Sequence, residues 1–309
     1  MEQEKTTELF RIGYLSRDSG LPLTTTSMNG LRKALLDDVE LYQLLQEAGY
    51  WGVGLYEADG SEDLLPRLKG GEFDLAFCTT RNWVDVSGEY NAFLQTREPE
   101  DIINSRTGFA LRRGVIFIGP THPLFAESIN ESTPQATTVQ RYFNTEEASP
   151  FAVVQSQDLA GYVAPLLWIE TQFTAAGMGS PFVQQQFLWC RSGDEVVKTV
   201  VSGLATIGAC EERELISTLH RSNLEDKQAR LIKVIARTAP IPAHPVILHN
   251  KLMANDALRR RLQSVLREYA RSGGLEGMQL NPSSNQDYLE AEMLMQRFRE
   301  VSSGTSTLP

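Results

Sequence analysis

The fold of this chain is decided by two stretches, EDLLPRLKGGEFDLAFCT (residues 62–79) and DEVVKTVVSGLATIGACE (residues 194–211), which align without a gap. Each begins with two acidic residues, which suit the first turn of a helix, and continues with apolar residues at helical spacing. Each predicted helix ends at glycine, as left-handed C-terminal turns prefer, and a short apolar strand follows. A helix that leads into a strand is half of a parallel α/β unit, so the two copies predict two similar lobes; the alternative is a chance likeness.

The strand in each copy ends at a cysteine, and a polar segment follows it. Ligands of open parallel sheets bind beyond the carboxyl ends of the strands, so these segments are the first candidates for a site. The candidates are Thr79, Thr80 and Arg81 after Cys78, and Glu211 after Cys210. Arg81 could hold a carboxylate or a phosphonate through two hydrogen bonds. The alternatives are a solvated loop that caps a helix and an ordinary surface acid.

The residues before each copy extend the pattern. The sequence predicts a strand at 10–15, a helix at 31–48 and a strand at 51–56 before the first copy. Before the second copy it predicts a strand at 151–155, a helix at 162–174 and a strand at 187–190. Strand–helix–strand–helix–strand is typical of a doubly wound, mostly parallel sheet. Ser16, in the loop after the first strand, is a further ligand candidate.

Two extended segments, at 106–119 and 230–237, are predicted to cross between the lobes as a two-strand hinge. Lobe 1 then holds residues 1–108 and 238–309, and lobe 2 holds residues 109–237. The polar segment 84–104 is predicted to be irregular. Prolines at 240, 242 and 245 predict that the residues after the second crossing form a sheet edge or a connector.

Composition excludes several classes of protein. The length of 309 residues suits two α/β lobes, and 41% hydrophobic with 22% charged residues is typical of a soluble globular protein. A net charge of −10 argues against binding to nucleic acid or to an anionic membrane. The four histidines lack metal-ligand spacing, and no common catalytic or nucleotide-binding motif occurs. We therefore expect no metal, no cofactor and no enzymatic activity.

The cysteines and the N-terminus each leave two interpretations. Three cysteines without framework spacing predict no disulfide, and Cys78 and Cys210 are better interpreted as buried strand-end residues than as reactive thiols. The first residues, MEQEKTTELFRIGYLS, do not resemble a signal peptide, and no stretch is long and apolar enough to span a membrane. The expected location is the cytoplasm as the sequence stands, or the periplasm if a signal peptide was removed.

Four segments of the chain resemble a known protein family. The segments YEADGSEDLLPRLKGGEFDLAF, GYVAPLLW, DEVVKTVVSGLATIGA and LIKVIARTAPIPAHPVILHNKL are similar, in this order, to the substrate-binding proteins of phosphonate and phosphite ABC transporters. The resemblance covers about residues 11–299 and includes Asp287-Tyr288 before the last helix. It implies a type II periplasmic-binding-protein fold that closes on a small ligand in a cleft between the lobes. It also implies an ABC permease as partner, if the chain is exported.

The resemblance also implies residues of the second lobe that contact the ligand. The family carries a Ser-Thr-Ser-Gly-Tyr-like run at the start of a helix, whose hydroxyl and N–H groups hold the oxyanion. Here the run is Asp158 to Tyr162, preceded by Ser156 and Gln157. An aspartate at this place would repel a phosphonate dianion by roughly 4 kcal/mol at ~4 Å and an effective dielectric constant of ~20.

Asp158 therefore favours a zwitterionic or amine-bearing ligand such as an aminophosphonate or an amino acid. The alternative is that Asp158 only caps its helix, and Tyr162 fits either a ligand contact or packing. The first-lobe loop, Cys78 to Trp83, also departs from the family's Gly-Pro-x-x-Tyr-like turn. Two other functions remain open, a cytoplasmic enzyme and a ligand sensor built on the same fold.

Overall fold

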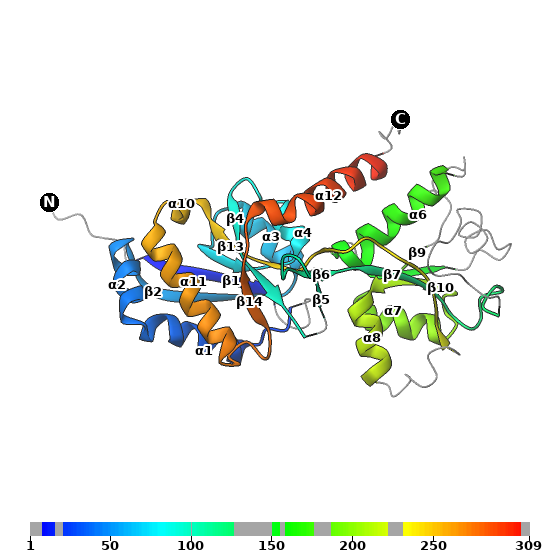
Figure 1. Cartoon of the computed structure of the whole chain (residues 1–309), viewed down its shortest axis with the longest axis horizontal. Coiled ribbons are helices and arrows are strands. Elements are labelled where there is room, and N and C mark those ends of the chain that lie inside the picture. The colour runs from blue at the N-terminus through cyan, green and yellow to red at the C-terminus, as the bar shows by residue number, and fades with distance from the viewer. Residues whose placement is uncertain are drawn as a thin grey trace. The chain divides into compact units, whose positions relative to one another are not determined.

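The computed structural model describes residues 8–15, 21–99, 101–126, 150–154, 158–175, 187–221 and 231–303. The chain forms two compact units (Figure 1). Unit 1 comprises Met1–Leu111 and Pro242–Glu292, and unit 2 comprises Arg112–Ile241 and Met293–Pro309.

Unit 1 contains a six-stranded mixed sheet in the order β14-β4-β13-β3-β1-β2. The strands are β1 (Glu8–Leu15), β2 (Tyr50–Ala58), β3 (Leu75–Phe77), β4 (Tyr90–Arg97), β13 (Pro245–His249) and β14 (Gln279–Pro282). β1 is parallel to β2 and β3, which gives the predicted strand–helix order, whereas β13, β4 and β14 pair antiparallel. The sheet is therefore mixed rather than mostly parallel.

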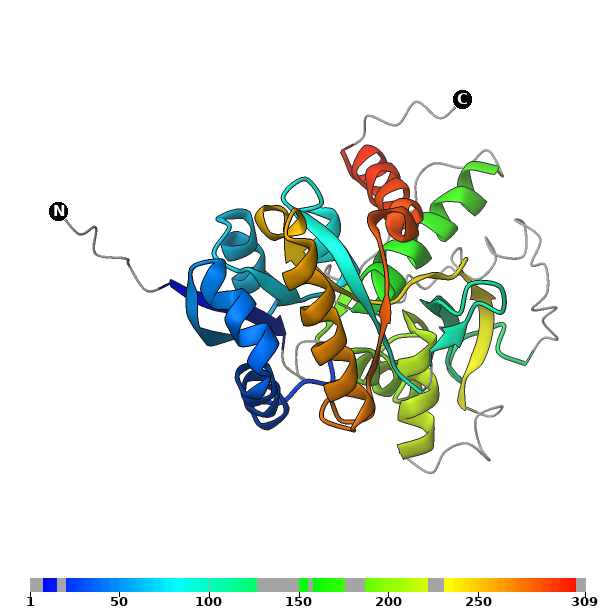
Figure 2. The ribbon, with the colours of Figure 1, turned by 60° about the vertical axis from the view of Figure 1, so that its left-hand side comes forward.

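Helices cover the sheet of unit 1. They are α1 (Thr25–Asp37), α2 (Val39–Glu47), α3 (Ser61–Lys69), α4 (Thr80–Val84), α10 (Asn250–Met253), α11 (Asp256–Arg271), the 3₁₀ turn η5 (Asn285–Tyr288) and the start of α12 (Leu289–Ser302). α1, α2 and α11 pack against one another (Figure 2). The single helix predicted at 31–48 is interrupted at Asp38, because its carboxylate caps α2 at the N–H of Leu41 and also binds Arg261 of α11.

Unit 2 contains a five-stranded mixed sheet in the order β11-β7-β10-β8-β9. The strands are β7 (Gly114–Ile118), β8 (Phe151–Val154), β9 (Phe187–Cys190), β10 (Ile207–Glu211) and β11 (Lys233–Arg237). The helices are the π-helical turn η2 (Leu159–Val163), α6 (Ala164–Ala175), α7 (Gly193–Val201) and α8 (Glu212–Arg221). A small third sheet joins β12 (Ile241–Pro242), β6 (Ala110–Arg112) and β5 (Ile102–Ile103).

The predicted repeat is confirmed. The helix–strand pairs α3–β3 and α7–β10 coincide with the two quoted stretches, and Gly71 and Gly203 adopt φ values of +66° and +79° in the turns between them. The order β2-β1-β3-β13-β4 in unit 1 matches β9-β8-β10-β7-β11 in unit 2, with the same parallel and antiparallel pairings. The two units thus share one topology.

Two predictions about unit 1 are wrong. Segment 84–104 contains the buried strand β4, in which Gln95 bonds to both backbone groups of Ala110 and Thr96 bonds to the carbonyl of His244. These polar residues belong to the core because their hydrogen bonds are satisfied. The segment after the second crossing, predicted as a sheet edge or a connector, contains the central strand β13, which lies between β3 and β4. Pro245 is tolerated there because it is the first residue of the strand.

Among the residues that the structure describes, none of the helices combines the length and the apolar character that crossing a membrane requires.

Candidate functional site

The loop after β3 is held by hydrogen bonds within unit 1. Thr79 caps α4: its hydroxyl accepts the N–H of Asn82 at 3.1 Å and donates to Oδ1 of Asn82 at 2.8 Å. Ser61, at the start of α3, donates to the same Oδ1 at 3.0 Å. Thr79 is buried, so the predicted candidate fixes the loop and exposes little of its own surface.

Thr80 is bonded to a residue distant in sequence. Its N–H donates to Nδ1 of His244 at 3.2 Å, and its hydroxyl donates to the carbonyl of Pro242 at 3.2 Å. The side chain is 1% exposed. No sequence pattern indicates His244, because this histidine follows the second crossing and only the sheet pairing brings it to the end of β3.

Arg81, the third candidate of this loop, is half-buried and binds a neighbour on its own helix. Its Nε lies 3.3 Å from Oδ2 of Asp85. Trp83 is fully buried with its ring 5.0 Å from that of Tyr288, so it packs in the core and forms no wall of a site. A guanidinium that already has a carboxylate partner attracts a second anion less strongly.

A carboxylate that sequence reasoning missed lies at the ends of β1 and β2. Glu57 Oε2 accepts hydrogen bonds from the hydroxyls of Tyr14 at 2.8 Å and Thr25 at 2.7 Å. Burial and the hydrogen bond to Glu57 raise the pKa of Tyr14 to about 12. The strand ends of unit 1 therefore carry a carboxylate held by two hydroxyl donors. Tyr14 and Glu57 lie in two separate strands and form no sequence motif, so the sequence alone does not identify Glu57 as a candidate.

In unit 2, Asp158 begins the helix that follows β8. Its Oδ1 accepts the N–H of Ala160 at 2.9 Å, which confirms the capping role. Asp158 has no ion-pair partner within the described part of the chain. Burial, and after it the charge of Glu211, raise the pKa of Asp158 to about 6. Glycine at 161 makes room for this carboxylate, since a Cβ would lie 2.6 Å from Oδ2 of Asp158.

Glu211 ends β10 and is buried, 3% exposed. Nε of Arg213 lies 3.1 Å from its Oε1, and Nε of Arg112 lies 3.7 Å from the same atom. The alternative of a surface acid is therefore wrong. The two guanidinium groups offset part of the charge of this buried carboxylate.

Glu214, on α8, is a second acid that sequence reasoning missed. Burial, followed by the charges of Glu211 and Asp158, raises the pKa of Glu214 to about 8. Its carboxylate lies against the start of α7, where a Cβ on Gly193 would come within 2.2 Å of Oε2. Glu211 ends β10, and Glu214 follows three residues later in the first turn of α8. This spacing is a sequence signal that could have indicated the pair.

Tyr162 packs between two aromatic rings of unit 2. Its ring centroid lies 5.5 Å from that of Trp189 and 5.7 Å from that of Phe298, and the residue is 8% exposed. Of the remaining predicted contacts, Ser16, Ser156 and Gln157 lie outside the described residues. Of the described candidates, Thr79, Thr80 and Arg81 thus belong to unit 1, and Asp158, Tyr162 and Glu211 belong to unit 2.

The surroundings of the three cysteines disfavour the reactive thiolate form. All three are buried, and burial raises the pKa of Cys78, Cys190 and Cys210 above the ordinary thiol value. In the described ranges, no cluster of three or more histidine, cysteine or acidic side chains has a geometry that could hold a metal ion.

Comparison with known proteins gives a family and a fold. The family model described as ABC transporter, phosphonate, periplasmic substrate-binding protein matches residues 41–303. No curated protein matches the sequence. Three solved structures have a similar fold. Their sequence identities to this chain are 11–18%, so the similarity shows the fold alone.

The first is a Xanthomonas citri protein bound to chloride ion, with 18% identity and a TM-score of 0.62 over 94% of this chain and 99% of that one. The second is a binding-protein component of an ABC phosphonate transporter from Pseudomonas aeruginosa, with 13% identity and a TM-score of 0.60 over 97% and 90%. The third is PhnD1 from Prochlorococcus marinus in complex with methylphosphonate, with 11% identity and a TM-score of 0.58 over 94% and 98%. All three support the α/β fold with two lobes.

Proposed function

We propose, because this chain belongs to the family of periplasmic substrate-binding proteins of phosphonate ABC transporters, that its ligand is a small organophosphonate that also carries an ammonium group. Members of this family bind a substrate for transport and are not enzymes, which removes the enzyme alternative. The ABC permease is the proposed partner and the periplasm the proposed location.

Asp158 is the observation that carries the choice of ligand. Its carboxylate lies at the end of β8, where binding proteins of open sheets meet their ligands, and it lacks an ion-pair partner among the described residues. Glu211 is paired with two arginines, whereas among the described residues the hydrogen bonds to Asp158 come from backbone N–H groups. The charge of Arg112 already acts on Asp158 and lowers its pKa, and an ammonium group would add a direct ion-pair partner. A plain phosphonate dianion would meet like charge instead.

The other predicted contacts remain part of the proposal. They are Ser16, Thr79, Thr80, Arg81, Ser156, Gln157, Tyr162 and Glu211. Thr79, Thr80, Tyr162 and Glu211 are all nearly enclosed by their neighbours, so we assign them the role of positioning the loop, the helix and the strand end that bear the contacts.

Calorimetric titration with 2-aminoethylphosphonate and ethylphosphonate tests this assignment, since the two differ only in the amine. We expect the aminophosphonate to bind more tightly. Asp158→Asn should weaken its binding roughly 10- to 100-fold, because a hydrogen bond to a charged group contributes about 1.5–3 kcal/mol.

Glu195→Gln, at an exposed acid of the same unit, is the matched control and should change neither affinity. If Asp158→Asn tightened ethylphosphonate binding and left the aminophosphonate unchanged, the role of Asp158 would be wrong. If neither phosphonate bound to the wild-type protein, the phosphonate assignment itself would be wrong.

A further inference from the structure

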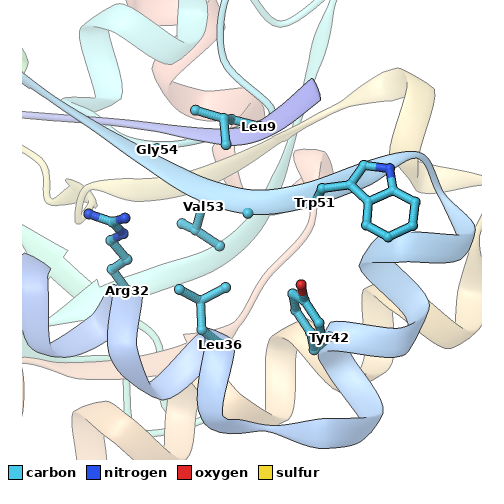
Figure 3. Close-up of a pocket in the computed structure, with 8 residues that line it drawn as sticks. Leu9, Arg32, Leu36, Tyr42, Trp51, Val53 and Gly54 are labelled. Carbon is cyan, nitrogen blue, oxygen red and sulfur yellow. The ribbon is translucent and has the colours of Figure 1, made fainter. Parts of the chain in front are cut away.

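Unit 1 has a groove on its surface that the transport function does not explain. It has a volume of about 610 Å³ and lies between the edge strand β2 and the helices α1 and α2. Its lining residues are Leu9, Arg32, Leu36, Tyr42, Trp51, Gly52, Val53 and Gly54 (Figure 3). A volume in this range is typical of sites for small molecules.

The groove lies away from the residues discussed above. Leu9 is the second residue of β1, and Trp51 to Gly54 belong to the first half of β2. Tyr14 and Glu57 lie near the opposite, carboxyl ends of the same two parallel strands. A ligand in the groove would therefore be separate from one at the carboxyl ends.

The polar side chains of the groove are a guanidinium cation, a phenol and an indole, and each of them can donate a hydrogen bond. Arg32 is exposed, and in the described part of the chain it has neither an ion-pair nor a hydrogen-bond partner. The same holds for the phenol of Tyr42 and the indole N–H of Trp51, and none of the lining residues is acidic. On a chain with a net charge of −10, this cation without a carboxylate partner favours an anionic ligand.

The remaining surface of the groove is apolar. Trp51 is 45% exposed and Leu9 is 49% exposed, so both side chains offer apolar surface to a ligand. Figure 3 shows Arg32 at one end, Trp51 and Tyr42 at the other, and Leu36 and Val53 between them. The arrangement fits a molecule with an anionic head and an apolar, preferably aromatic, tail.

We infer that this groove is a second ligand site, which binds a small amphipathic carboxylate. The carboxylate binds Arg32 through charge-assisted hydrogen bonds. The apolar tail lies over Leu36 and Val53 and ends against the rings of Trp51 and Tyr42, which are amphipathic surfaces with little side-chain entropy to lose. The inference rests on unit 1 alone and does not depend on the proposed function.

Calorimetric titration of the full chain with 4-phenylbutyrate, and with the uncharged 4-phenylbutyramide, tests the site. We expect one molecule of 4-phenylbutyrate to bind per chain, with the amide at least tenfold weaker. Arg32→Gln should weaken 4-phenylbutyrate at least tenfold and leave the amide unchanged. Trp51→Ala should weaken both compounds, because it removes the surface for the tail.

Lys33→Gln is the matched control, since it removes the neighbouring exposed charge on α1 without touching the groove, and it should have no effect. Asp158→Asn should also leave 4-phenylbutyrate binding unchanged. Absence of binding at millimolar concentrations, or equal losses in Arg32→Gln and Lys33→Gln, would overturn the proposal. So would a dimer in sedimentation that Trp51→Ala dissociates, because the groove would then be an interface between two copies.

Discussion

At the scale of single residues, unit 2 depends on the absence of a side chain at position 161. Gly161 lets the carboxylate of Asp158 fold back over the first turn of its own helix, and it lets that turn approach the backbone N of Glu211. The absence of a side chain at Gly161 therefore allows the helix cap and the end of β10 to lie close together.

Gly161→Ala should consequently disturb the site. A Cβ would lie 2.6 Å from Oδ2 of Asp158 and 3.1 Å from the backbone N of Glu211, so the carboxylate must move. We expect a loss of about 1–3 kcal/mol in the free energy of unfolding, typical of overpacking, together with weaker binding of 2-aminoethylphosphonate. Urea titration and calorimetry measure the two effects.

Gly60→Ala is the control, since a Cβ at that position has no neighbour within 4 Å. If the two alanine variants were equally stable and bound the ligand equally well, the close approach at Gly161 would be without consequence.

At the scale of elements, the sequence predicted what depends on local pattern and missed what depends on pairing. The helices and short strands of the repeat follow from apolar spacing and from terminal glycines, and all are present. β4 was missed because its polar residues are satisfied by Ala110 and His244, far along the chain. His244 was missed as a partner of Thr80 for the same reason, because the two residues are distant in sequence. The capping role of Asp158 could be predicted, because it depends only on the position of Asp158 at the start of a helix.

Gln95 illustrates how a polar residue stabilises a buried strand. It is 0% exposed and forms hydrogen bonds with both the N–H and the carbonyl of Ala110, at 2.9 and 3.0 Å. Gln95→Leu should cost about 1–3 kcal/mol of unfolding free energy, because two buried backbone groups lose their partners.

Gln43→Leu makes the same change at an exposed position of α2 and should alter stability by less than about 0.5 kcal/mol. Chemical denaturation compares the two. Equal stability of both variants would show that water or a shifted side chain replaces Gln95.

At the scale of the whole molecule, stability should depend on pH through the acids of unit 2. The pKa values of Asp158 and Glu214 are raised to about 6 and about 8, so the folded protein holds protons that the unfolded chain releases above about pH 4. Through these two acids, linkage makes stability fall as pH rises from about 4 to about 8 and level off above it. The lowered pKa of His249 acts in the opposite direction below about pH 6.5. Acids with lowered pKa values, such as Asp38 and Glu212, act below this range.

Glu214→Gln isolates the upper part of this range, because the amide carries no proton to release. Melting temperatures of the wild type and the variant should converge at pH 5 and diverge toward pH 8, where the variant is the more stable relative to wild type. Glu195→Gln serves as the control. A difference between wild type and Glu214→Gln that stays constant from pH 5 to pH 8 would contradict the assigned proton.

The position of β13 has a consequence for how the protein is made. β13 lies between β3 and β4, yet it is encoded after the whole of the unit 2 sheet. At a synthesis rate of ~5–20 residues per second, β13 follows β3 from the ribosome by roughly 9 to 34 seconds, so the early strands of unit 1 wait that long for their central neighbour. In that interval β3 presents an open edge, which is a target for chaperones and for mispairing. Unit 2 has all five of its strands by residue 237, so the middle of the gene product can fold before its beginning.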